Sequence, residues 1–155
     1  YEIMPSLVGS EMCIRDRSAN RPMLQSIRRY VENGGKLLAE CGGMMYLCDE
    51  IRDKNGDVFP MVGVLHQSAT MENMKLRLGY RTLLYNDARL KGHEFHYSRL
   101  VEQQDPLPSC AVAYTAKGVE TDTPLYHYKN VWAGYTHLYW ADPAGNDWFT
   151  KFIIK

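Results

Sequence analysis

The chain lacks the features that mark several large classes of protein. Its 155 residues contain no apolar run near the roughly 20 residues that a membrane-spanning helix needs. Lys and Arg number 18, and Asp and Glu number 18, so there is no basic excess of the kind that nucleic-acid binding leaves. The N-terminus has no basic head followed by an apolar stretch, as a signal peptide would. The composition is that of one globular domain, or of part of a larger protein.

The four cysteines lack the spacing of a zinc site or a disulfide scaffold. They stand at positions 13, 41, 48 and 110, and no two of them form a C-x-x-C pair. We therefore expect reduced thiols in a cytoplasmic protein. Cys48 and Cys110 are interpreted as core residues, since a free cysteine is usually buried and inert.

The first part of the chain has no clear secondary-structure period. Residues 5–17 (PSLVGSEMCIRDR) fit neither a helix nor a strand. This stretch resembles a translated sequencing-adapter string of the kind found fused to metagenomic reading frames. Residues 1–17 are therefore predicted to be a non-native leader, in which Cys13 has no functional meaning. A natural N-terminal extension is the alternative.

From Ser18 onward the pattern is that of an α/β domain. Asn20 is the expected N-cap of a helix whose apolar residues recur at helical spacing as far as Val31. A short apolar run at 36–39 predicts a buried strand, and a second helix is predicted over Met44–Ile51. Helix, strand, tight turn and helix in this order are typical of a layered α/β domain with a parallel sheet.

The remainder is predicted to consist mainly of strands and to end in a short helix. The helix follows Asp142-Pro143-Ala144-Gly145-Asn146 and continues through Phe152. The predicted strands are rich in Val, Tyr, Leu and Thr, and they cover Val58–Leu65, Leu76–Leu84, His93–Val101, Cys110–Ala116 and Leu125–Tyr139.

Cys41 stands where the predicted buried strand meets the second helix. Small residues, Ala39 and Gly43, flank it at minus two and plus two, which is the pattern of a nucleophile elbow. We expect the helix N-terminus to lower the pKa of the thiol and the backbone N–H of Gly42 to donate to an oxyanion. The alternative is that Cys41 is a small buried core residue.

A thiol nucleophile needs a histidine base that the fold brings near it. The chain offers five candidates, namely His66, His93, His96, His127 and His137. His137 follows the apolar run 131–136, so it is expected at the edge of the sheet where the elbow lies. His93 and His96 are three residues apart on a predicted strand and point to opposite faces, so no shared metal is expected.

Four segments, taken together in this order, carry a family resemblance. They are A-E-C-G-G-M-M-Y-L at 39–47, L-G-Y-R at 78–81, G-H-E-F-H-Y-S at 92–98 and G-Y-T-H-L-Y-W at 134–140. From about Ser18 to the C-terminus the chain resembles the C-terminal glutaminase domain of cobyrinic acid a,c-diamide synthase. That family amidates two carboxylates of the corrin ring in cobalamin biosynthesis, using glutamine and ATP.

The resemblance implies a three-layer α/β fold of the class I glutamine amidotransferase type. The implied sheet is mostly parallel and flavodoxin-like with flanking helices, and the domain would be truncated at its N-terminus. Cys41 would attack the side-chain amide of glutamine, His137 would act as its base, and Gly42 would form half of the oxyanion hole. The implied partners are the synthetase domain of the same parent chain and, at that domain's site, a corrinoid acid.

Three departures from the family pattern limit what this chain is expected to do. The class I acid two residues after the histidine is replaced by Tyr139, so either a Cys-His dyad suffices or another acid such as Glu94 takes the role. No Gly-Gly-x-Pro-Glu turn, the source of the second oxyanion donor, occurs between Tyr1 and Arg17. Loss of one such donor typically costs about 10²–10³ in rate.

The third departure is that no P-loop motif occurs anywhere in the chain. ATP and Mg²⁺ would therefore belong to the synthetase domain, and this chain is expected to bind no cofactor and to be unable to perform the ATP-dependent step alone.

Weaker candidates for holding glutamine or lining an ammonia path come from the second and third segments and the elbow. They are Gly43, Arg81, Glu94, His96, Tyr97 and Ser98, with a purely structural role as the alternative for the strand residues.

Other functions stay open at this point. The synthase that amidates nickel sirohydrochlorin is barely separated by these motifs, and the glutaminase domain of cobyric acid synthase shares the fold. A non-catalytic amidotransferase-like module, or a cysteine hydrolase without preference for glutamine, would also fit.

Overall fold

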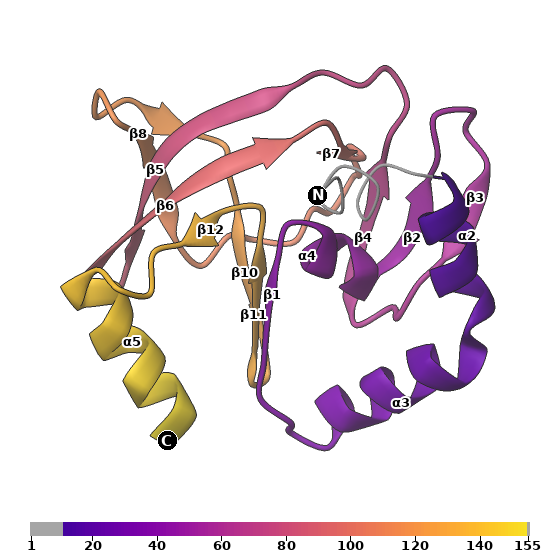
Figure 1. Ribbon diagram of the computed structural model, residues 1–155, viewed down its shortest axis with the longest axis horizontal. Coiled ribbons are helices and arrows are strands. Elements are labelled where there is room, and N and C mark those ends of the chain that lie inside the picture. The colour runs from indigo at the N-terminus through magenta and orange to yellow at the C-terminus, as the bar shows by residue number, and fades with distance from the viewer. Residues whose placement is uncertain (1–10, 155) are drawn as a thin grey trace.

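The computed structural model describes residues 11–154, which fold into helices packed around three sheets (Figure 1). The helices are α2 (Glu11–Ala19), α3 (Arg21–Glu32), α4 (Gly42–Leu47) and α5 (Pro143–Ile154). The strands are β1 (Leu37–Glu40), β2 (Cys48–Arg52), β3 (Val58–Pro60), β4 (Leu65–Thr70), β5 (Arg77–Tyr85), β6 (Ala88–His96), β7 (Arg99–Leu100), β8 (Val112–Thr115), β9 (Glu120–Thr121), β10 (Leu125–Tyr128), β11 (Val131–Gly134) and β12 (His137–Leu138).

The predicted succession of helix, buried strand, tight turn and helix is present as α3, β1 and α4. Asn20 caps α3, because its side chain accepts a hydrogen bond from the backbone N–H of Met23 at 3.2 Å. Leu24 and Val31 lie on the buried face of this amphipathic helix. α3 therefore begins at its expected cap, and its apolar face packs on the core.

The α/β class is confirmed, but the sheets are mixed rather than mostly parallel. The orders are β1-β11-β10, β12-β6-β5-β8-β9 and β3-β2-β4-β7. Among the described strands, β1 pairs with β11 and β2 with β4 in parallel, and the other pairings are antiparallel. Tight hairpins account for the difference, since a two-residue turn can join only antiparallel neighbours. Asn86 and Lys129 adopt the positive φ that two of these turns require.

Several predicted boundaries were wrong. The strand expected over Leu125–Tyr139 is three strands, β10, β11 and β12, and the strand expected over Val58–Leu65 covers β3 and only the first residue of β4.

The helix expected over Met44–Ile51 ends at Leu47, where β2 begins and runs parallel to β4. Backbone bonds from Val62 to Tyr46 and from Val64 to Leu47 use the carbonyls that would have continued the helix, so tertiary pairing overrides local propensity.

Residues 5–17, expected to fit no regular element, include the start of α2 at Glu11. The part of this stretch before residue 11 lies outside the described residues. Ile14 on α2 is 2% exposed and packs in the main core cluster.

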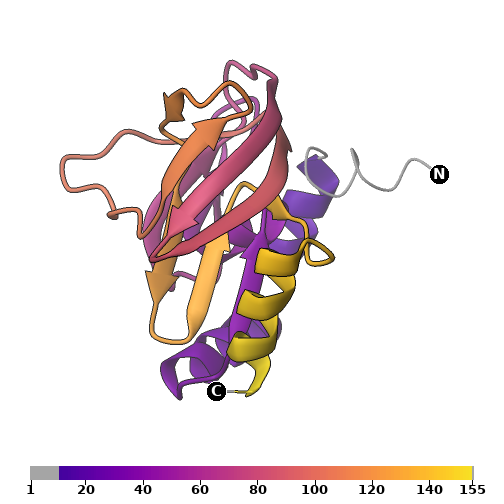
Figure 2. The same ribbon diagram turned by 90° about the vertical axis from the view of Figure 1, so that its left-hand side faces the viewer.

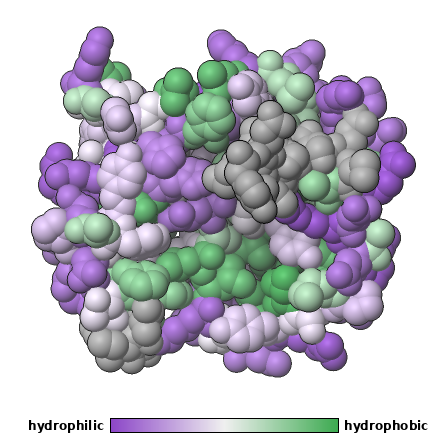
Figure 3. Space-filling model, viewed as in Figure 1, coloured by the Kyte–Doolittle hydropathy of each residue, from purple (hydrophilic) through white to green (hydrophobic). Residues whose placement is uncertain are grey.

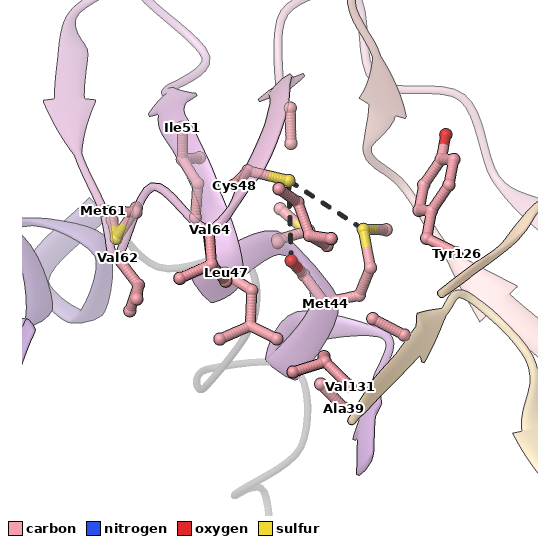
Figure 4. Packing of buried hydrophobic residues seen from close by; sticks show 14 of the residues in the cluster. Ala39, Met44, Leu47, Cys48, Ile51, Met61, Val62, Val64, Tyr126 and Val131 are labelled. Carbon is pink, nitrogen blue, oxygen red and sulfur yellow. Dashed lines mark hydrogen bonds between the residues drawn. The ribbon is translucent and has the colours of Figure 1, made fainter. Parts of the chain in front are cut away.

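The main hydrophobic core lies between α4, β1, β11 and the β2–β4 sheet (Figure 4). Cys48 is buried in it, as predicted, and donates to the backbone carbonyl of Met44, whereas Cys110 is only half-buried and packs against a second cluster. This second cluster forms where Trp148 of α5 meets the sheet that contains β5 and β6.

Figure 2 shows α5 near one end of the long β5–β6 hairpin. Figure 3 shows hydrophobic side chains gathered in a hollow between α5 and α3.

Gly92 controls how closely β12 can pack on β6. A Cβ added at this residue would lie 2.3 Å from the backbone oxygen of His137 and 2.7 Å from Cγ2 of Thr136. Because backbone cannot move aside as a flexible side chain does, Gly92→Ala should push β12 away and lower the free energy of unfolding by about 1–3 kcal/mol. Urea unfolding followed by circular dichroism measures this. Lys91→Ala, an exposed neighbour on the same strand, should change stability little, and equal effects of the two variants would contradict the packing argument.

Candidate active site

Cys41 forms a strained junction between β1 and α4. It is the N-cap residue of α4 and has φ 52° and ψ −113°, a conformation that costs a non-glycine residue about 1–3 kcal/mol. Its backbone N–H donates to the carbonyl of Gly134 at 2.8 Å, which fixes the turn against the end of β11. The methyl group of Ala39 lies 3.5 Å from where a Cβ at Gly43 would stand. The strand–turn–helix geometry expected of a nucleophile elbow is therefore present.

The Cys41 thiol is enclosed and protonated at rest. It is 5% exposed, and its sulfur makes a weak hydrogen bond to the backbone oxygen of Phe95 at 3.8 Å. Burial raises the pKa of Cys41, and the charges of Glu40 and Glu94 raise this pKa further, although the backbone N–H of Gly42 lowers it in part. The expected net lowering of the Cys41 pKa was wrong: the backbone N–H of Gly42, the first residue of α4, does lower this pKa, but by less than burial raises it.

His137 lies on β12 against the middle of β6. It is opposite His93 in the antiparallel pairing, and the two rings stack with centroids 4.9 Å apart. Burial lowers the pKa of His137, and the neighbouring His93 and His96 lower it further. At neutral pH the imidazole is therefore uncharged and can accept a proton.

The parallel pairing of β1 with β11 makes the two strands end at the same edge of their sheet; Cys41 follows β1 directly, and His137 comes three residues after β11, on β12 of another sheet. Glu40 is in register with Gly134, so the chain after each strand emerges on the same side. The two segments are joined by the bond from Cys41 to Gly134 and by a second bond, from the backbone N–H of Leu138 to Oε1 of Glu40 at 3.1 Å. Within residues 11–154, however, the thiol bonds to the Phe95 carbonyl rather than to the imidazole.

Glu40 is the acid that lies beside His137. Its Oε2 is 3.9 Å from Nδ1 of the imidazole, while Oε1 accepts from Leu138. Burial raises the pKa of Glu40, and the Leu138 bond lowers it in part. The sequence analysis named Glu94 as an acid that could orient the histidine and did not consider Glu40, although Glu40 directly precedes Cys41 in the chain. The alternation of β1 offered no signal that a residue before the elbow would reach across to β12.

Glu94 belongs instead to a buried polar network. Its carboxylate accepts from Arg81 Nε at 2.6 Å, from Thr123 Oγ1 at 2.8 Å, and bonds to His96 Nε2 at 2.7 Å. Burial alone would raise the pKa of Glu94, but the hydrogen bonds from His96 and Thr123 and the charges of His96 and Arg81 lower it to about 2. Glu94 is therefore a buried carboxylate whose charge is fully partnered.

The weaker substrate-binding candidates divide into two groups. Arg81, His96 and Ser98 are buried and bonded inside the protein, His96 through Nδ1 to the Ser98 carbonyl at 2.8 Å and by stacking on Tyr135. Gly43 and Tyr97 are exposed. The geometry favours the structural interpretation for the buried three, and contact with glutamine stays a prediction.

The other two histidines lie in different places. His66 is exposed and pairs with Asp49, and His127 stacks on Trp132. Across residues 11–154 no three His, Cys, Asp or Glu side chains are grouped as metal ligands would be. In the same span, no helix has the length and apolar character that crossing a membrane takes.

Comparison with known proteins places the chain among amidotransferases. The family model of the CobB/CobQ-like glutamine amidotransferase domain matches residues 6–145. A crystal structure of a glutamine amidotransferase superposes with a TM-score of 0.58 over 93% of this chain and 75% of that one, at 18% identity. At that identity the superposition shows a shared fold alone.

Curated relatives are longer enzymes. The chain is 33% identical over 129 residues to a hydrogenobyrinate a,c-diamide synthase of Stutzerimonas stutzeri, and these cover 83% of the chain and 29% of the relative. It is 36% identical over 136 residues to a cobyrinate a,c-diamide synthase of Caldanaerobacter subterraneus, covering 83% and 30%. The chain therefore spans about 30% of the length of the curated relatives it matches.

Replacing Glu94 by Gln should destabilise the protein, because the buried Arg81 and His96 side chains depend on the Glu94 carboxylate. The substitution keeps the shape but leaves the Arg81 and His96 side chains without their anion, so the free energy of unfolding at pH 7 should fall by about 3–5 kcal/mol. Because the pKa of Glu94 is lowered to about 2 from 4.5, its stabilisation is complete above pH 4.5 and is lost as the pH falls toward 2. Urea unfolding should show that the difference in unfolding free energy between the unaltered chain and Glu94→Gln is smaller at acid pH than at pH 7. Asp49→Asn, which removes an exposed pair, should cost less than about 1 kcal/mol; a Glu94→Gln loss independent of pH would contradict this account.

Proposed function

The chain belongs to the family of CobB/CobQ-like glutamine amidotransferase domains, and we propose that it releases ammonia from glutamine with Cys41 as nucleophile and His137 as base. The observation that carries the proposal is the strained elbow at Cys41, bonded to the end of β11 three residues before His137. A positive-φ cysteine at a strand–helix junction exposes backbone N–H groups beside the sulfur, as acyl transfer requires.

The reaction starts from a neutral thiol and a neutral imidazole. Burial raises the pKa of Cys41 and lowers the pKa of His137, so neither group carries a charge before substrate arrives. As the sulfur attacks the amide carbon of glutamine, the thiol proton moves to His137 and a carbon–sulfur bond forms. The resulting oxyanion would accept a hydrogen bond from the backbone N–H of Gly42, the residue after Cys41, and this N–H already lowers the pKa of the thiol.

Collapse of this intermediate breaks the carbon–nitrogen bond. The amide nitrogen takes the proton from His137 and leaves as ammonia, and a glutamyl thioester remains on Cys41. Water then gives a proton to His137 and attacks the thioester, which releases glutamate and restores the thiol. To reach the sulfur, substrate must displace its weak contact with the Phe95 carbonyl, since Cys41 is 5% exposed.

The named relatives support a proposal about the whole enzyme. The chain would be the glutaminase part of a cytoplasmic synthase that uses ATP and Mg²⁺ in another domain to amidate the a and c carboxylates of cobyrinic or hydrogenobyrinic acid. The support for this substrate is the printed activity of two relatives, each matched over 83% of this chain. Synthase carrying this domain should place two ¹⁵N atoms from amide-labelled glutamine in its corrin product. Mass spectrometry showing unlabelled amides, or one label, would contradict the assignment.

Alkylation by the glutamine analogue 6-diazo-5-oxo-norleucine tests the nucleophile directly. The reagent should modify Cys41, with a rate that rises with pH because the thiol pKa is raised. His137→Ala should slow the reaction by about 10²–10⁴, the usual contribution of a general base. Peptide mass spectrometry locates the adduct, and Cys41→Ser should abolish it.

Cys110→Ser is the matched control for this labelling. Cys110 is half-buried, and burial raises its pKa to about 11, so it should contribute no glutamine-directed labelling. Free glutamine should protect Cys41. Labelling that glutamine does not slow, or that survives in Cys41→Ser, would overturn the proposed function.

A further inference from the structure

We infer that Glu40 is the positioning residue that holds His137 in its working orientation and tautomer. The inference rests on the proposed function and deepens it, because a base that accepts a proton from a thiol needs a partner for its other ring nitrogen. Position 139, where a class I acid would stand, is a tyrosine and is exposed. Among the described residues, Glu40 is the carboxylate within ion-pair distance of His137.

One oxygen of Glu40 binds the backbone of β12, and the other faces the ring of His137. Oε1 accepts from the backbone N–H of Leu138 at 3.1 Å, which fixes the chain directly after His137. Oε2 lies 3.9 Å from Nδ1 of His137, so this oxygen faces the nitrogen on one side of the ring and leaves Nε2 for proton transfer. One carboxylate thus constrains both the backbone and the ring of the base.

Without substrate, the Glu40 carboxylate and the His137 ring are near each other but do not form a hydrogen bond. A separation of 3.9 Å is too long for a hydrogen bond, and the attraction does not reverse the lowering of the pKa of His137 that burial causes. Catalytic hydrogen bonds are often long before substrate binds. When His137 takes the thiol proton it becomes a cation next to Glu40, and the attraction between them then favours the charged state.

The stacked His93 ring supplies the second constraint. It lies 4.9 Å from the His137 ring at an interplanar angle of 15°, which restricts rotation of the imidazole out of this plane. His93 is cross-strand from His137, so β6 provides the stack and β1 provides the acid. The base is therefore held between elements from two different sheets.

Glu40→Gln separates the charge of Glu40 from its shape. The amide oxygen can still accept from Leu138, so the fold should be retained, whereas the negative charge beside Nδ1 is lost. Alkylation of Cys41 by 6-diazo-5-oxo-norleucine should slow roughly 10- to 100-fold, less than on removal of the imidazole. The ¹⁵N spectrum of the His137 ring should show less of the Nδ1–H tautomer, and its pKa should fall.

Two further variants keep the test decisive. Glu40→Asp retains the charge on a shorter side chain and should recover part of the rate and of the tautomer signal. Glu50→Gln removes a half-buried carboxylate on β2 that pairs with Arg52, away from this site, and should change neither.

The outcomes distinguish this inference from the proposed function. If His137→Ala slows alkylation but Glu40→Gln changes neither the rate nor the ¹⁵N spectrum, Glu40 is not the positioning residue and the proposed function stands. If Cys41 of the unaltered chain is not alkylated, the proposed function fails, and the ring spectrum alone then decides whether Glu40 sets the tautomer.

Discussion

The site depends on the in-register parallel pairing of β1 with β11. This pairing sets Glu40 beside Gly134, and the N–H of Cys41 extends it by one more bond to the Gly134 carbonyl. A shift by one residue would turn every side chain of β1 to its opposite face and separate Glu40 from β12. The strained φ of Cys41 is tolerated because the packed elements on either side, β1 and α4, over-determine it.

Electrostatics around the pair follow from burial. Desolvation disfavours the charged form of any group, so it raises the pKa of Cys41 and of Glu40 and lowers the pKa of His137. At neutral pH the thiol and the imidazole are therefore both uncharged, and in the proposed reaction charge would appear only as a proton moves between them. Preorganised donors and a nearby carboxylate then act in an environment where charge is poorly screened, which increases what each contributes.

The sequence predicted the strand–turn–helix junction at Cys41, which the structure has, but not the groups that surround it, and the roles of Cys41 and His137 stay proposals. Cys41 and His137 were proposed because each follows an apolar run that ends at a sheet edge, which is a local signal. Alternation along 93–98 also predicted that Glu94 and His96 share a face, and they do bond to each other. The mixed sheets and the early end of α4 could not be read locally, since they arise from bonds to residues 62–64 and from hairpin turns far along the chain.

The origin of residues 1–17 and the substrate contacts of the 92–98 segment stay predictions. Glu40 was quoted in a motif without being given a role, because nothing in strand periodicity says that a residue before an elbow reaches a strand almost a hundred residues later. The raised pKa of Cys41 was missed for a related reason: the sequence shows that a helix starts there, but not that the thiol is buried and bonded to the Phe95 carbonyl of β6.

Glu94 and Glu40 both lie close enough to Cys41 to raise its pKa, but their surroundings shift the pKa of their own carboxyl groups in opposite directions. Glu94 is fully buried, and its partners stabilise the charged form so strongly that its pKa falls to about 2; a group so satisfied cannot respond to a proton moving elsewhere. Glu40 has a raised pKa, one firm hydrogen bond and one oxygen still 3.9 Å from its neighbour. Its electrostatic stabilisation is incomplete until His137 is charged. An acid whose attraction to the histidine is strongest when the imidazole is charged would lower the barrier to proton transfer. An acid that stabilised the resting and charged states equally would leave this barrier unchanged.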